Sequence, residues 1–319
     1  MELLAAEARL FSADSAPNTN RLSEIIESTS LSPRTRLRAA VLLAILADNL
    51  FDVPLLKHAF EASSELLTGS EADAAVLQLI FHSTLGDRPS AAQYLMLVAR
   101  ESLSSSDYTA RLFGLRRCAE ASLRIGDTRA AAKFSGEALQ LSERLMLPYQ
   151  VAESTVMLIR ALLAQDEVPA ARLRADHLRR TQQTQQGDLR RHTLIADTLV
   201  AWHSQDECLM RRGRDDLLAI KRPPIPRAEQ TYLAVRQAGS LICGDSVSYD
   251  EDLVRLGELH RSGSRFGGQD FPSSVLFSSL RRLGFDRDAR RLRTRYLNRT
   301  RCEPYEVPAT LLSLAKQPK

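Results

Sequence analysis

The 319-residue chain has few of the side chains on which disulfide frameworks and metal sites depend. Its four cysteines lie at least 35 residues apart, and none belongs to a CxxC pair. No two of its six histidines are three or four residues apart, so no helix face carries the paired imidazoles of a metal site. This spacing indicates isolated, reduced thiols, and we expect a cytoplasmic protein without a metal or a cofactor.

Long hydrophobic runs and catalytic motifs are also missing. No apolar segment approaches the roughly 20 residues that span a bilayer, and the opening MELLAAEARLF lacks the basic region of a signal peptide. The chain contains neither a GxxxxGK[ST] loop nor a GxSxG turn, and the glycines of 262–268 do not form GxGxxG. We therefore expect a protein that is not an enzyme and does not contact a membrane.

The chain has no large excess of charge of one sign: 43 basic and 39 acidic residues give a net charge of +4. That excess is too small to indicate a nucleic-acid partner. The basic residues are 38 arginines and five lysines. One explanation is selection of guanidinium groups for phosphate or carboxylate recognition. The other, which we favour, is a codon bias that places arginine on ordinary solvated helix faces.

The chain is rich in apolar residues at helical spacing. Ala131, Phe134, Ala138, Leu141 and Leu145 form one stripe along a single helix face. The segment 151–163 is apolar on two faces, which is typical of a helix covered on two sides. Strand-like alternation is nearly absent, so the periodicity predicts an all-α protein.

Turn signals recur at a constant interval. The pairs Gly86-Asp87, Gly126-Asp127, Asp166-Glu167 and Asp206-Glu207 are each 40 residues apart. Glycine tolerates the left-handed conformation that ends one helix, and an acidic residue caps the next. Such an interval predicts stacked helix hairpins, because one hairpin cannot bury its own apolar face. The predicted hairpins are 34–50 with 53–67, 70–85 with 88–103, 106–125 with 128–146, 148–165 with 168–184, and 188–204 with 207–220.

These signals divide the chain into four regions. Residues 1–32 are predicted to form N-terminal capping helices, near 2–12 and 20–30, and residues 33–220 form the repeat array. Three prolines in 223–226 interrupt the array. Residues 221–300 are predicted to continue the stack as a C-terminal helical subdomain, with helices at 227–243, 249–262, 272–283 and 286–299. Residues 301–319 form a tail.

The segment 119–139 resembles a tetratricopeptide repeat. Gly126-Asp127 lies at the hairpin turn, and Ala131 and Ala138 lie seven residues apart in the second helix, where that family has small residues at helix contacts. The interval of 40 residues exceeds the family's roughly 34. In this the chain is similar to the longer tetratricopeptide-like regions of bacterial transcription activators. The resemblance implies a right-handed α-solenoid of about 40-residue antiparallel helix hairpins.

The resemblance also implies where a partner binds. In the family the first helix of each hairpin lines the concave surface, which places Arg116, Glu120, Arg124, Glu153 and Arg160 on that surface. They are our candidate contacts for a protein or peptide partner. A competing interpretation is that Glu120 and Arg160, at equivalent positions of adjacent repeats, pair with each other. A surface pair of this kind contributes only ~0–1 kcal/mol.

The most basic stretch is 281–301, which holds nine arginines and two aspartates. Arg287, Arg291 and Arg295 occupy one helix face, where they are candidate contacts for phosphate or for an acidic partner. No DNA-binding helix–turn–helix and no set of stacking aromatic residues accompanies them. Contact with nucleic acid is therefore the less favoured hypothesis.

Taken together, the sequence favours a non-catalytic scaffold or adaptor that binds a protein or peptide and has a regulatory role. Homo-oligomer formation stays open. The alternative function is a regulatory component of bacterial gene expression, which senses a ligand or partner and contacts nucleic acid through the basic C-terminal helix.

Overall fold

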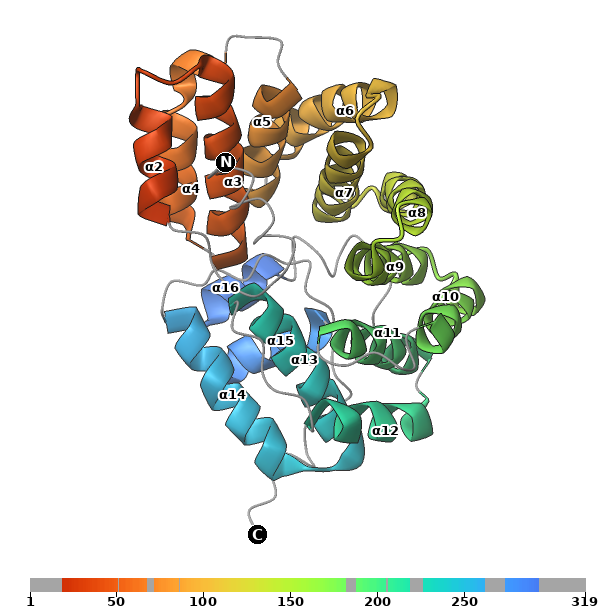
Figure 1. Cartoon of the computed structure of the whole chain (residues 1–319). Helices are drawn as coiled ribbons and strands as arrows, with labels where there is room; N and C mark the ends of the chain where they lie inside the picture. The colour runs from red at the N-terminus through yellow and green to blue at the C-terminus, as the bar shows by residue number, and fades with distance from the viewer. Residues whose placement is uncertain are drawn as a thin grey trace. The chain divides into compact units, whose positions relative to one another are not determined.

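The computed structural model describes residues 19–50, 52–67, 72–85, 87–181, 188–204, 206–218, 226–261 and 273–292. Every regular element in these ranges is a helix, as the sequence periodicity predicts (Figure 1). None of these helices is both long enough and apolar enough to span a membrane. The helix expected at 2–12 and the tail at 301–319 lie outside the described residues. The chain divides into two compact units, Met1–Ile125 and Gly126–Lys319.

The N-terminal unit is a series of helices in which each packs against the next along the chain. In addition, α3 packs against α5 and α5 against α7, so the first helices of successive pairs contact one another directly. The elements are α2 (Thr19–Glu27), α3 (Pro33–Leu50), α4 (Val53–Glu61), the short 3₁₀ helix η1 (Ser64–Leu66), α5 (Ala72–Leu85), α6 (Arg88–Ser104) and α7 (Tyr108–Ile125).

In the C-terminal unit each helix from α8 to α13 likewise packs against the next along the chain, whereas α15 packs against α13 and α16. Here α9 packs against α11 and α11 against α13, whereas α10 and α12 share no comparable contact. The first helices therefore lie side by side, while the second helices α10 and α12 stand apart. The elements are α8 (Thr128–Arg144), α9 (Pro148–Leu163), α10 (Val168–Thr181), α11 (Asp188–Ser204), α12 (Glu207–Leu218), α13 (Pro226–Cys243), α14 (Ser246–Arg261), α15 (Ser273–Arg282) and α16 (Asp286–Leu292).

Local chemistry explains where these helices begin and end. Gly126 has a φ of 82° in the turn between α7 and α8, and Asp127 then accepts a hydrogen bond of 3.0 Å from the backbone N–H of Ala130. This satisfies one of the backbone donors left open at the start of α8. In the turn between α9 and α10, Asp166 takes the left-handed position with a φ of 62°. The predicted pairing of a left-handed glycine with a capping acid is thus confirmed at Gly126-Asp127, and again at Gly244-Asp245, where Asp245 accepts from the backbone N–H of Ser248.

Small and branched apolar residues hold the middle of the C-terminal unit together. Ala131 and Ala138 of α8 have no exposed surface, as expected for residues at a close helix contact. One cluster joins α9, α10 and α11; its buried members are Ala152, Val156, Ile159, Leu163, Ala171, Ala175, Leu178, Ile195, Ala196, Leu199 and Val200. A second joins the end of α11 to α12–α15 through Ala201, Trp202, Met210, Ala238, Leu241, Tyr249, Leu253 and Val275. Helix α11 is therefore covered on two sides.

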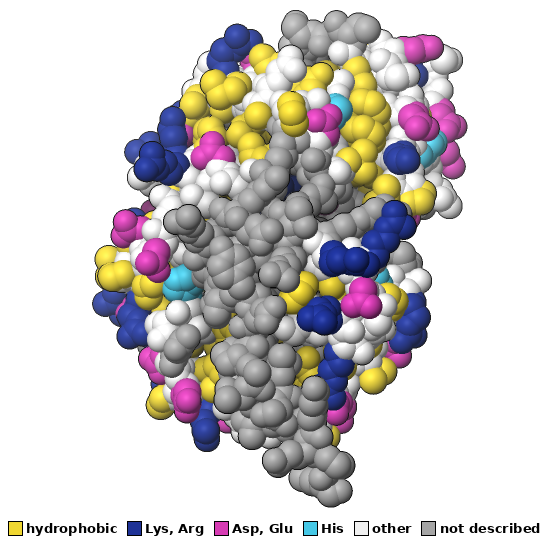
Figure 2. Space-filling view, turned by 180° about the vertical axis from the view of Figure 1, so that it is seen from behind, with side chains coloured by type: hydrophobic (Ala, Val, Ile, Leu, Met, Phe, Trp, Pro, Cys, Tyr) yellow, Lys and Arg dark blue, Asp and Glu magenta, His cyan; other side chains and the backbone are white. Residues whose placement is uncertain are grey.

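Charged side chains of both signs lie on the outside of the helices. On the face shown in Figure 2, lysine and arginine side chains occur in several separate groups, and aspartate and glutamate side chains lie beside many of them. That distribution is typical of solvated helix surfaces and supports the second explanation of the high arginine content.

Candidate functional site

The structure buries two of the five residues predicted to contact a partner. Arg116 is 5% exposed and Arg124 is 7% exposed, both on α7. The Arg124 guanidinium donates to Glu120 Oε1 over 2.9 Å and also binds the carboxylate of Asp48 and the hydroxyl of Thr84. Asp48 and Thr84 belong to α3 and α5, the first helices of the two preceding pairs. Direct packing of the first helices thus turns Arg124 into a link between them.

The other predicted contacts lie closer to the surface. Glu120 is half-buried and also accepts from Arg117 over 2.8 Å, so its carboxylate is paired with two arginines of its own helix. Glu153 and Arg160 are half-buried on α9. A pair between Glu120 and Arg160 stays a prediction, because the two residues belong to different compact units. The binding role of all five residues likewise stays a prediction.

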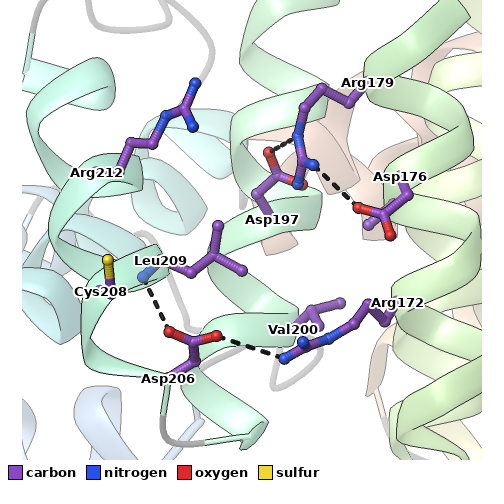
Figure 3. Close-up of a pocket in the computed structure, with 10 residues that line it drawn as sticks. Arg172, Asp176, Arg179, Asp197, Val200, Asp206, Cys208, Leu209 and Arg212 are labelled. Atoms are coloured by element: carbon purple, nitrogen blue, oxygen red, sulfur yellow. Dashed lines mark hydrogen bonds and ion pairs between the residues drawn. The ribbon is translucent and has the colours of Figure 1, made fainter.

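A groove of about 350 Å³ lies instead on the second helices of the C-terminal unit (Figure 3). Its walls come from α10 and α12, the two helices that share no extensive contact, and α11 lies between them. We call it the α10–α12 groove. Its lining residues are Arg172, Ala175, Asp176, Arg179, Asp197, Val200, Asp206, Cys208, Leu209 and Arg212.

The centre of the groove is held by a buried carboxylate. Asp197 of α11 is 6% exposed and accepts two hydrogen bonds from Arg179 of α10, one of them from Nε at 2.9 Å. Burial raises the pKa of the Asp197 carboxyl, and the hydrogen bonds from Arg179 oppose that shift. Arg179 also donates from Nη1 to Asp176 over 2.9 Å. One guanidinium therefore holds two carboxylates in place through fixed, fork-like geometry.

A looser pair lies on the other side of the groove. Arg172 Nη2 is 3.5 Å from Asp206 Oδ2 and 3.4 Å from the hydroxyl of Ser204, distances at the limit of a hydrogen bond. Asp206 has a second task, because its Oδ1 accepts from the backbone N–H of Leu209 over 3.0 Å and so caps α12. The carboxylate is held by this cap, whereas Arg172 is about half exposed.

The α12 wall presents an exposed cation. Arg212 makes no ion pair or hydrogen bond with any described residue, although its charge acts on nearby Asp197 and opposes the rise in the pKa of that carboxyl. Beside it the wall offers the exposed thiol of Cys208 and the partly buried side chain of Leu209. The groove thus holds three arginines and three aspartates. Each aspartate has a partner, and among the arginines Arg212 does not.

The buried carboxylate is engaged by a bidentate guanidinium, which holds it as a hydrogen-bond acceptor and leaves it poorly placed to exchange protons. No histidine lines the groove. Within the described ranges, no three His, Cys, Asp or Glu side chains are grouped so that they could hold a metal ion.

The groove is not predicted by the sequence patterns described above, although part of its signal is visible in them. Arg172, Asp176 and Arg179 are spaced i, i+4, i+7 and so share one face of α10. Asp197 interrupts the otherwise apolar stripe of α11 between Leu194 and Leu199. Neither pattern shows that α12 stands away from α10. The groove exists because of this separation, so it could not be predicted from either helix alone.

The basic C-terminal segment is described only in part. Arg287 is exposed on α16, whereas the side chain of Arg291 and the whole of Arg295 lie outside the described residues. Arg281 and Arg290 are also exposed, and Arg282 pairs with Asp250 of α14 over 3.0 Å.

No protein-family model matches the chain, and no curated protein matches it.

Proposed function

We propose that the chain is a non-catalytic helical-repeat protein that binds a protein or peptide partner, and that the partner lies in the α10–α12 groove. The observation that carries this proposal is the groove itself, an open space of about 350 Å³ lined by charged side chains of three successive helices. A stack of helix pairs is well suited to this task, because each pair adds to an extended surface without a closed active site.

The proposal includes the architecture implied by the tetratricopeptide resemblance, a right-handed solenoid of about 40-residue hairpins. Helix caps support the interval, since Asp87 caps α6 and Asp127 caps α8 at positions 40 residues apart. The direct contacts α3–α5, α5–α7, α9–α11 and α11–α13 support a stack in which first helices follow one another. A cytoplasmic location and a regulatory role belong to the same proposal.

The relation between first and second helices explains why we move the partner site. Residues at the contacts between first helices, such as Arg124, are already engaged within the fold. The second helices α10 and α12 leave a gap, in which Arg172 and Arg212 are accessible. Accessible, incompletely paired charges are the groups that gain most from a partner of complementary charge.

Charge reversal in the groove tests the proposal. The variant Arg172→Glu/Arg212→Glu changes both walls, and Arg174→Glu/Arg211→Glu is the matched control, because its residues are exposed on the same two helices outside the groove. We expect proteins that wild type and control retain from native extract, measured by quantitative mass spectrometry, to be lost by the groove variant. Equal retention by all three forms contradicts the assignment of the groove.

The alternative function in gene expression is favoured by one observation, the exposed arginines 281, 287 and 290 on α15 and α16. It predicts binding to duplex DNA that weakens steeply with salt. The variant Arg287→Ala/Arg291→Ala/Arg295→Ala should then bind more weakly, with a smaller salt slope in a fluorescence polarisation assay. Absence of DNA binding by wild type at low salt removes this alternative.

A further inference from the structure

The charges of the α10–α12 groove are arranged as a fixed dipole. On the α10 side, Asp176, Arg179 and Asp197 together carry one net negative charge, because a single guanidinium serves two carboxylates. On the α12 side, Arg212 carries one positive charge and makes no ion pair or hydrogen bond with a described residue. Figure 3 shows Asp176 and Arg179 on one wall, Arg212 on the other, and Asp197 between them.

The negative end of this dipole is accessible at Asp176. Its side chain is 44% exposed and accepts from Arg179 through Oδ1, so Oδ2 remains open to a further donor. Asp197 is different, since both of its oxygens already accept from Arg179 and its side chain is only 9% exposed. A cationic group entering the groove therefore meets Asp176 first.

The positive end is accessible at Arg212, and the remaining pair adds no net charge. Arg172 and Asp206 compensate each other across 3.5 Å, and Asp206 stays bound to the N-terminus of α12. Between the two ends, the lining is apolar at Ala175, Val200 and Leu209. A ligand that complements this surface places opposite charges at its two ends and aliphatic groups between them.

We infer that the α10–α12 groove binds a peptide segment bearing one acidic and one basic side chain, with the acid on Arg212 and the base on Asp176. This inference rests on the proposed function and specifies the partner's chemistry. The volume of about 350 Å³ lies near the lower limit for ligand sites, which suits a few side chains of an extended segment. Charge-assisted hydrogen bonds at both ends fix the direction of the segment as well as its affinity.

The test uses synthetic biotinylated peptides on a biosensor surface and the full chain in solution. One set carries a Glu and a Lys separated by spacers of varying length; the companion sets carry Glu with Gln, Lys with Gln, or Gln twice. We expect the best mixed peptide to bind about tenfold more tightly than either singly charged companion, because each lost charge-assisted contact contributes about one order of magnitude. Equal binding of a singly charged peptide overturns the inference, as does the absence of any binding above the Gln peptides.

Two variants of equal charge locate the contact. Asp176→Asn/Arg212→Gln removes both ends of the dipole, and Arg211→Gln/Asp215→Asn removes one positive and one negative charge from exposed sites of α12 outside the groove. The first variant should retain the wild-type melting temperature, because Arg212 makes no ion pair or hydrogen bond with a described residue and the pair of Asp176 with Arg179 is partly exposed. We expect the first variant alone to lose the preference for mixed peptides. Preserved preference in that variant overturns the inference.

Small zwitterions serve as competitors in the last part of the peptide-binding experiment. Free lysine and free glutamate carry both charges on one small molecule, and displacement of the mixed peptide by either would overturn the assignment to a peptide segment.

The outcome of these peptide experiments is separable from the outcome of the test of the proposed function. If extract proteins depend on the groove while peptides of one charge sign bind best, only the inference fails. If mixed peptides bind and no extract protein does, the proposed function fails.

Discussion

Replacing Arg124 by methionine tests whether this residue joins the first helices of the N-terminal unit or serves a partner. Arg124 is 7% exposed, and its guanidinium binds Asp48 of α3, Thr84 of α5 and Glu120 of α7. Methionine keeps most of the side-chain length but donates no hydrogen bond. The change therefore removes the link between three helices while leaving the packing volume nearly constant.

The expected loss follows from the groups that stay behind. Asp48 is 6% exposed and retains a hydrogen bond of 3.1 Å from the Thr84 hydroxyl, and Glu120 retains its pair with Arg117. Removing one member of a buried ion pair typically costs about 3–5 kcal/mol. Because both carboxylates keep a donor, we expect the lower end, a loss of about 3 kcal/mol in the free energy of unfolding.

Urea denaturation followed by far-UV circular dichroism measures this loss. We expect the midpoint of the transition of the N-terminal unit to fall by roughly 1 M or more. Adding Asp48→Leu to Arg124→Met should recover most of the stability, because it also removes the buried carboxylate that had lost its guanidinium. A change below about 1 kcal/mol in the single variant would show that the network contributes little and would refute our account of Arg124.

Three further predictions concern packing, pH and backbone conformation. Ala138→Leu should destabilise the C-terminal unit by about 1–3 kcal/mol, because Ala138 has no exposed surface, and an unchanged melting temperature would show that it is not at a helix contact. The pKa of Asp87 is lowered, chiefly by its hydrogen bond with Ser90 and further by His82. The contribution of this carboxylate to the stability of the folded state is therefore complete above the unfolded pKa of about 3.9, and it is lost as the pH falls below that value. Between neutral pH and about pH 3, the melting temperature of Asp87→Ala should therefore fall less steeply than that of the wild type. Met146 is 84% exposed with a φ of 52°, so Met146→Gly should relieve strain and raise stability by about 1 kcal/mol; a lower melting temperature contradicts this.

Much of the helix pattern could be predicted because its signals are local. The segments predicted at 148–165 and 188–204 correspond to Pro148–Leu163 and Asp188–Ser204. An aspartate that caps a helix and a glycine that adopts a positive φ act within a few residues, so their spacing marks turns without knowledge of the tertiary contacts. Likewise, the apolar stripe through Ala131 and Ala138 is enough to predict which face of α8 is buried.

The candidate site could not be predicted in the same way, because the role of a charged side chain depends on neighbours that are distant in the sequence. Arg124 and Arg212 are both arginines near polar residues on helices of similar pattern. One is a buried link to residues 40 and 76 positions earlier, and the other is an exposed cation beside a groove. No spacing within either helix distinguishes these environments.

The amino-acid order by itself determined the all-helical class, the approximate helix bounds and the burial of the alanine-rich faces, because backbone capping and amphipathic periodicity act over one or two turns of helix. Only the tertiary structure decided that α9 and α11 pack directly while α10 and α12 stand apart. That choice depends on how side chains of separate helices fit together, and it is what leaves Asp176 and Arg212 facing the same groove.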